Sequence, residues 1–186
     1  MVRVVVAYHS GYGHTKKLAE AVGDGAGSVP GAVARLLAVE DIDAQGWQAL
    51  EAADAIVFGA PTYMGGPSAQ FKVFADASAK AWFSGLWRDK VAGGFTCSLS
   101  MSGDKFSTLS YLATLAMQHG MIWVGTGTMP AQQPGAPEAI NRLGGYFGVM
   151  AQADNVSPEL SPPKGDLESA RGYGQRVAKL AKALRG

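Results

Sequence analysis

The chain alternates short, continuously apolar segments with segments whose apolar residues recur at helical spacing. The apolar segments, which predict strands, are 2–8, 33–39, 55–59, 90–97 and 121–125. The segments with helical spacing are 15–22, 43–53, 68–83, 106–118 and 167–184. Strands that are apolar throughout suit the interior of a parallel sheet, because helices cover both of its faces. The alternation therefore predicts one domain over residues 1–186, an α/β doubly wound parallel sheet.

Residues 129–165 interrupt this alternation. The segment is rich in proline and glycine and has no periodic apolar pattern, so it predicts a long irregular excursion. Loops of this length in a compact domain are usually functional.

Composition excludes several classes of protein. A length of 186 residues allows one domain with a sizeable core, and a net charge of +1 gives no electrostatic basis for binding nucleic acid. Cys97 is the single cysteine, which excludes an intramolecular disulfide and a cysteine-built metal site. No apolar stretch is long enough to span a membrane, and the N-terminal run lacks a cleavage-like region. We therefore expect no membrane insertion, a cytoplasmic location and no bound metal.

Polar turns follow three of the predicted strands. They are HSGYGHT at 9–15, APTYMGG at 60–66 and SLSMSGDK at 98–105. Ligands of doubly wound sheets bind at the carboxyl ends of the strands, near the switch in strand order. The three turns are therefore expected to form one site.

The first turn has the chemistry of a phosphate-binding loop. Its amides and the positive end of the following helix converge on one point, and Ser10, Tyr12 and Thr15 add hydroxyl donors. It lacks the lysine of the GxxxxGK(S/T) loop and the third glycine of the GxGxxG fingerprint. A phosphate monoester held by neutral donors fits best, whereas the alternative is an ordinary strand-to-helix turn with a capping hydroxyl.

The second and third turns suit a flat heteroaromatic ring. Tyr63 or Met64 could stack on such a ring, and the small residues of the third turn let backbone amides approach its polar edge. Taken singly, each is better explained as a generic loop. Together with a phosphate loop, they predict a site for flavin mononucleotide (FMN).

Four segments carry a resemblance to a known family. They are YHSGYGHT, PTYMGGPSAQFKVFAD, AWFSGLWRDKVAGGFTCSLS and LAMQHGMIWVG, and they cover most of residues 1–127. The chain resembles the flavodoxin-like flavoproteins, most closely the WrbA type of NAD(P)H:quinone oxidoreductase within the NADPH-dependent FMN reductases. The resemblance implies a flavodoxin-like five-stranded sheet of order 2-1-3-4-5 with helices on both faces. It also implies FMN as cofactor, NADPH or NADH as reductant, and a homodimer or homotetramer.

The resemblance also implies roles for individual residues. Those expected at the FMN phosphate are Ser10, Gly11, Tyr12, Gly13, His14 and Thr15. Those expected at the isoalloxazine ring are Pro61, Thr62, Tyr63, Met64 and Gly65. Those expected beside the ring are Cys97, Ser98, Leu99, Ser100, Met101, Ser102 and Gly103.

Trp82 and His119 match residues that line the quinone and nicotinamide pocket of the family, often across a subunit boundary. His119 is the candidate for binding or protonating the acceptor. The alternative is a structural role, because a histidine at a helix C-terminus interacts favourably with the helix dipole.

The chain departs from the family at the ring. PTYMGG stands where the family commonly has PTRFGN, so an arginine near the ring is lost. SLSMSGDK stands where the family has a run like TGTGGGQE, and the bulkier Leu99 and Met101 change access to the flavin. Residues 127–166 match the family poorly.

These observations predict an FMN oxidoreductase that passes two electrons from NAD(P)H to a quinone-like acceptor. Two alternatives are a flavodoxin-type electron carrier and a regulatory FMN-binding protein without turnover. Single-electron carriers of the flavodoxin type tend to be strongly acidic, so a net charge of +1 argues against the first.

Overall fold

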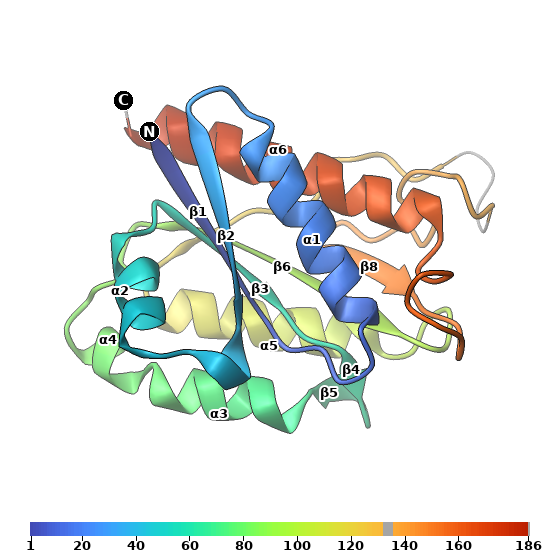
Figure 1. Cartoon of the computed structure of the whole chain (residues 1–186), viewed down its shortest axis with the longest axis horizontal. Coiled ribbons are helices and arrows are strands. Elements are labelled where there is room, and N and C mark those ends of the chain that lie inside the picture. Colours follow the sequence, from blue (N-terminus) through green and yellow to red (C-terminus); the bar gives the residue numbers. More distant parts are fainter. Residues whose placement is uncertain (132–135, 186) are drawn as a thin grey trace.

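The computed structural model describes residues 1–131 and 136–185. A parallel sheet runs through the centre of the molecule (Figure 1). Its strands are β1 (Val2–Tyr8), β2 (Ala32–Ala38), β3 (Ala55–Gly59), β6 (Val91–Ser98), β7 (Ile122–Trp123) and β8 (Val149–Gln152). The order is β2-β1-β3-β6-β7, with β8 also paired to β6. The predicted flavodoxin-like doubly wound sheet is confirmed.

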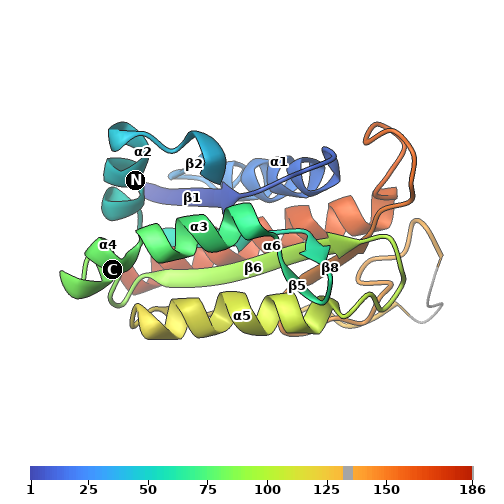
Figure 2. The same ribbon diagram turned by 90° about the horizontal axis from the view of Figure 1, so that it is seen from below.

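Helices cover both faces of the sheet (Figure 2). One face carries α1 (His14–Gly27) and α6 (Lys164–Arg185). The other carries α2 (Ala44–Ala52), α3 (Ala69–Ala77), α4 (Ala79–Phe83) and α5 (Lys105–Gln118). Successive side chains of β1 point to opposite faces of the sheet. Val4 and Val6 pack in the hydrophobic core beneath α1 and α6, whereas Val5 and Ala7 pack in the core beneath α2 to α5.

The fifth strand differs from the prediction of a single strand over 121–125. β7 pairs with the start of β6, at Val91 and Ala92, whereas β8 pairs with the end of β6, from Phe95 to Ser98. β7 and β8 thus share the position next to β6, and the chain between them, residues 124–148, is an insertion. The prediction that 129–165 is irregular throughout is wrong at β8, because an eight-residue buried strand needs a partner along its whole length. Residues 132–135 of that prediction lie outside the described residues.

The first helix extends beyond the predicted residues 15–22 and includes three glycines, Gly23, Gly25 and Gly27. A Cβ on Gly25 would lie 1.9 Å from the backbone oxygen of Arg171, and one on Gly174 would lie 2.0 Å from that of Val22. The backbones of α1 and α6 thus touch where they cross, and glycine is what this contact requires. These two glycines serve packing and do not end the helix.

Two shorter elements matter for the site. The chain between β3 and α3 forms a hairpin of β4 (Thr62–Tyr63) and β5 (Gly66–Pro67). A 3-10 helix, η1 (Val39–Asp41), follows β2. The helix predicted over 68–83 is divided into α3 and α4 at Ser78, whose hydroxyl donates to the Ala75 carbonyl at 2.6 Å. None of the described helices is both long and apolar enough to cross a membrane.

Candidate functional site

The three polar turns meet at one end of the sheet and line a cavity of about 530 Å³. A cavity of this size is in the range of small-molecule and cofactor sites. The lining residues come from four segments: Tyr12, His14 and Thr15; Pro61, Thr62 and Tyr63; Cys97, Ser98 and Leu99; and Ala153, Asp154, Asn155 and Val156. The structure therefore brings the predicted turns together and adds a fourth segment, which follows β8.

The fourth segment was not predicted, because it belongs to the excursion. Its Val156 carbonyl lies 2.9 Å from His14 Nε2, and Glu159 lies 3.9 Å from Lys17. The segment that follows β8 thus packs against the first turn and the start of α1. The sequence of β8, VMAQ, does not alternate apolar and polar residues, so it offers no periodic signal that could have located it.

The first turn presents free backbone donors at the N-terminus of α1. Ser10 Oγ accepts from the amides of Gly13 and Lys16, both at 3.1 Å. No described residue accepts a hydrogen bond from the amides of Tyr12, His14 or Thr15. Free amides at the positive end of a helix are a suitable site for an anion.

Gly13 is required by the shape of this turn. Its φ of +90° lies in the left-handed region, and a Cβ there would lie 2.8 Å from the Pro158 ring. Only glycine adopts this conformation without strain. The turn geometry is therefore specified by the sequence, and the segment that follows β8 packs against it.

The hairpin of the second turn anchors itself through Thr62. This threonine is 8% exposed, and its Oγ1 lies 2.8 Å from Thr96 Oγ1 and 2.7 Å from Thr108 Oγ1. These hydroxyls join the hairpin to β6 and α5. The Thr62 side chain therefore faces the protein interior, and its role is to place the hairpin.

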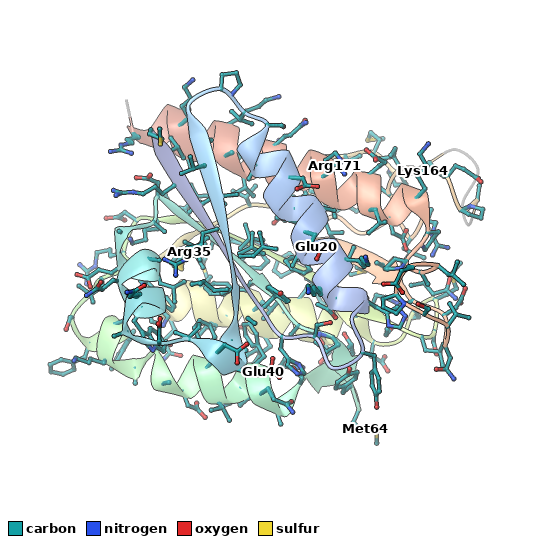
Figure 3. All side chains as sticks on the ribbon, viewed as in Figure 1. Glu20, Arg35, Glu40, Met64, Lys164 and Arg171 are labelled. Carbon is teal, nitrogen blue, oxygen red and sulfur yellow. The ribbon has the colours of Figure 1, made fainter. Side chains whose placement is uncertain are left out.

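The two ring-stacking candidates of the hairpin lie differently. Tyr63 lines the cavity and packs edge-on against Tyr12, with ring centroids 6.2 Å apart. Met64 is fully exposed at the hairpin tip and projects away from the rest of the molecule (Figure 3). With Gly65, it forms the turn, and both have positive φ. Tyr63 is thus the residue of this turn that is placed to contact a ring in the cavity.

The third turn lines two cavities. Cys97, Ser98 and Leu99 line the first, whereas Met101 and Ser102 line a neighbouring cavity of about 750 Å³. Cys97 is buried, and this burial raises the pKa of its thiol to about 11, so the sulfur stays neutral. Ser100 and Gly103 contribute backbone to the turn and line neither cavity.

A buried lysine supports the third turn from behind. Lys105 is 1% exposed, and its Nζ donates to the carbonyls of Ser100, Met101 and Ser102 at 2.7, 3.1 and 3.4 Å. Burial lowers the pKa of its ammonium to about 8. The sequence places a lysine directly after the turn but gives no sign that it is buried.

Beside Lys105, a buried ion pair joins the insertion to α6. Arg142 Nε and Nη2 donate to the two carboxylate oxygens of Asp166 at 2.8 and 3.0 Å, and the Gln152 amide donates to the same carboxylate at 2.9 Å. Both charged side chains are more than nine-tenths buried. The pair fixes β8 and therefore the segment that completes the cavity.

His9 connects the first two turns. Its Nδ1 lies 2.7 Å from Ser68 Oγ, just after the hairpin, and its Nε2 lies 3.3 Å from Glu40 Oε1 in η1. His9 and Ser68 are almost fully buried, at 2% and 1% exposed. This serine is therefore inaccessible as a nucleophile, and the group of three holds the turns in register.

His119 and Trp82 lie at the opposite end of the sheet from the three turns. His119 caps α5 at its C-terminus, and the 14 residues of this helix span about 21 Å. With Trp82, it lines a separate cavity of about 350 Å³. Within one chain, these two residues do not meet the cavity formed by the turns.

The hydrogen bonds of His119 indicate its tautomer, and its burial determines its charge. Its Nε2 lies 2.9 Å from Ser78 Oγ, and because that hydroxyl already donates to Ala75, Nε2 must be the donor. Nδ1 is buried and has no partner among the described residues. Burial lowers the pKa of the imidazole to about 4, so it is neutral near pH 7.

Comparisons with known proteins identify relatives of this chain. A family model described as NADPH-dependent FMN reductase matches residues 41–135, about half of the chain. Flavodoxin FldP of Pseudomonas aeruginosa is 43% identical over 99% of both chains. An NAD(P)H dehydrogenase (quinone) of Geobacter sulfurreducens is 32% identical over all of both chains. The crystal structure of a WrbA-like flavodoxin from Agrobacterium tumefaciens superposes with a TM-score of 0.78 at 50% identity, covering 98% of this chain and 99% of that one.

FMN fits the residues present. The cavity combines free amides at a helix N-terminus with neutral hydroxyls and an aromatic wall, which match a monophosphate and a planar ring. The family indicates FMN as cofactor and NAD(P)H as reductant. The chain belongs to the NADPH-dependent FMN reductase family of flavodoxin-like oxidoreductases.

Proposed function

We propose that this protein is an FMN-dependent NAD(P)H:quinone oxidoreductase. The observation that carries the proposal is the single cavity in which an anion-binding turn, an aromatic hairpin and a turn held by Lys105 converge. Relatives that match the whole chain and are named NAD(P)H dehydrogenase (quinone) support the choice of reductant and acceptor.

FMN supplies the redox chemistry when bound, because its ring accepts hydride from a nicotinamide and gives two electrons to a quinone. The chain's own residues position it. The amides of Tyr12, His14 and Thr15 hold the phosphate without a cationic side chain, and Tyr63 supports the ring. Leu99 is 59% exposed beside the cavity and is placed to restrict which acceptors approach.

A second candidate is a flavodoxin-type electron carrier, and the relative named flavodoxin FldP favours it. The two functions differ in substrate turnover. A carrier exchanges single electrons with protein partners and needs no bound nicotinamide or quinone. A net charge of +1 remains an argument for the enzyme, because carriers of this type use strong negative charge to steer toward basic partners.

A third candidate is a regulatory FMN-binding protein in which turnover is incidental. It shares every feature of the cofactor cavity with the enzyme, so the cavity alone does not separate the two. The relatives named as dehydrogenases favour the enzyme.

A turnover assay separates these functions. The purified protein is reconstituted with FMN, freed of excess flavin, and mixed with NADPH or NADH in the presence and absence of benzoquinone. We expect nicotinamide oxidation that depends on both FMN and benzoquinone. Bound FMN with no benzoquinone-dependent oxidation would exclude the enzyme, and absence of FMN binding would exclude all three candidates.

We further propose that a second copy of the chain brings Trp82 and His119 to the cavity. The support is their distance from the turns within one chain, together with the pocket that they share. A homodimer or homotetramer is therefore expected in sedimentation experiments, and Trp82→Ala should raise the KM for benzoquinone. A monomer that turns over quinone at full rate would exclude this role.

A further inference from the structure

Lys105 occupies an unfavourable position for a cation. It is the first residue of α5, where the helix dipole repels positive charge, and it is 1% exposed. Both effects disfavour an ammonium group unless other groups compensate. The compensation is provided by the three consecutive carbonyls of 100–102, so the lysine and the third turn stabilise one another.

Little else holds this turn in place. Leu99 and Met101 are 59% and 49% exposed, so their side chains do not anchor it in a core. Ser98 Oγ donates to the Ser100 carbonyl at 3.1 Å, and the Lys105 amide donates to the Ser102 carbonyl at 3.2 Å. Arg142 Nη1 donates to Met101 Sδ at 3.7 Å, so among the described residues the Met101 carbonyl depends on the ammonium alone. The conformation of the turn therefore depends on this ammonium.

The direction of the carbonyls fixes the direction of the amides. In a trans peptide, the C=O of one residue and the N–H of the next point in opposite directions. Since the carbonyls of 100–102 point to Lys105, the amides of 101–103 point away from it. No described residue accepts a hydrogen bond from these three amides.

We propose that Lys105 is a positioning residue of the flavin site: it fixes the third turn, whose first residues, Cys97, Ser98 and Leu99, line the flavin cavity. The inference rests on the proposed function and adds a residue to it. The ammonium also lies behind three aligned peptide dipoles, so it increases the positive potential on the side of the turn that faces away from it.

The charged and titratable groups around Lys105 are few. Cys97 faces it from β6, Asp166 from α6, and Arg142 from the insertion, whereas Asp104 precedes it in the chain. Asp166 is paired with Arg142, and the Cys97 thiol is neutral. Lys105 therefore is the group expected to titrate near pH 8. Its ammonium is present below that pH and is lost as the pH rises.

The test is the dissociation constant of FMN, measured by flavin fluorescence from about pH 6.5 to about pH 9.5. Lys105→Met should weaken FMN binding by about 10- to 100-fold at neutral pH, the usual effect of losing charge-assisted hydrogen bonds. Wild-type affinity should fall toward that of Lys105→Met as the pH passes 8. Lys105→Arg should keep tight binding over the whole range, because a guanidinium stays charged.

Controls separate positioning from folding and from the proposed function. Lys179→Met removes an exposed lysine of α6 and should leave FMN affinity unchanged. Circular dichroism checks that each variant folds, and if Lys105→Met does not fold, the wild-type and Lys105→Arg pH profiles decide. Wild-type affinity that is flat across pH 8, or equal affinity in a folded Lys105→Met, would overturn this inference alone. Tight FMN binding without turnover would overturn only the proposed function.

Discussion

Replacing Arg142 by methionine tests how the insertion is held to the rest of the domain. The variant leaves the Asp166 carboxylate 1% exposed and with one of its three donors, the Gln152 amide. Removing one partner of a buried ion pair typically costs about 3–5 kcal/mol. For a domain of this size, each kcal/mol lowers Tm by roughly 2–4 °C. We therefore expect Tm to fall by roughly 6–20 °C.

The stability of Arg142→Met should also depend on pH in a characteristic direction. Burial already raises the pKa of Asp166 against the opposing effect of Arg142, so loss of the arginine raises it further. The native state then binds a proton more readily than the unfolded state, and stability rises as the pH falls. Arg142→Met should thus recover part of its loss between about pH 7.5 and about pH 5.5.

Urea unfolding of the FMN-free protein at both pH values measures these effects. The double variant Arg142→Met, Asp166→Asn removes the unpaired charge and should be more stable than Arg142→Met alone at the higher pH. Lys72→Met, which breaks the exposed pair with Asp76, is the control and should change little. A loss below about 1 kcal/mol for Arg142→Met, or one that acid does not relieve, would refute the reasoning.

Three further predictions concern Gly13, Cys97 and His119. Gly13→Ala should weaken FMN binding and cost at least about 1 kcal/mol, because φ is positive and a Cβ would meet Pro158; Gly27→Ala, in open space, should cost nothing. The Cys97 thiol, with its pKa raised to about 11, should react slowly with Ellman's reagent in the native protein and fully in urea, and rapid native labelling would contradict its burial. His119, with its pKa lowered to about 4, binds fewer protons folded than unfolded, so stability should fall as the pH drops from about 6.5 to about 4. Melting curves of His119→Gln should lack this slope.

The parts of the fold that were predicted depend on local pattern. β1 and its turn were found because a continuous apolar run and a glycine-containing polar segment are adjacent in sequence. The same holds for β3 and the hairpin that follows it. Strand order came from the family resemblance, and the structure confirms it. The cofactor came from the combination of the three turns, and the family comparison confirms it.

The parts that were missed depend on contacts between distant segments. β8 is four residues long and becomes a strand because the end of β6 offers it a partner. The bounds of α1 were wrong because its glycines look like helix-ending residues until α6 is packed against them. Oligomeric state and the cytoplasmic location stay predictions, since they depend on surfaces and partners outside one chain.

The sequence by itself determined the alternation of strands and helices and the neutral chemistry of the phosphate turn. Both depend on residues close together in the chain, where backbone preference and apolar period act directly. The tertiary structure decided that residues 153–156 complete the cavity, that Lys105 is buried behind the third turn, and that His119 lies far from the first turn. Burial and the direction of a side chain are set by whatever packs against it, and here those neighbours include residues distant in the chain, such as Asp166 for Lys105 and Ser78 for His119.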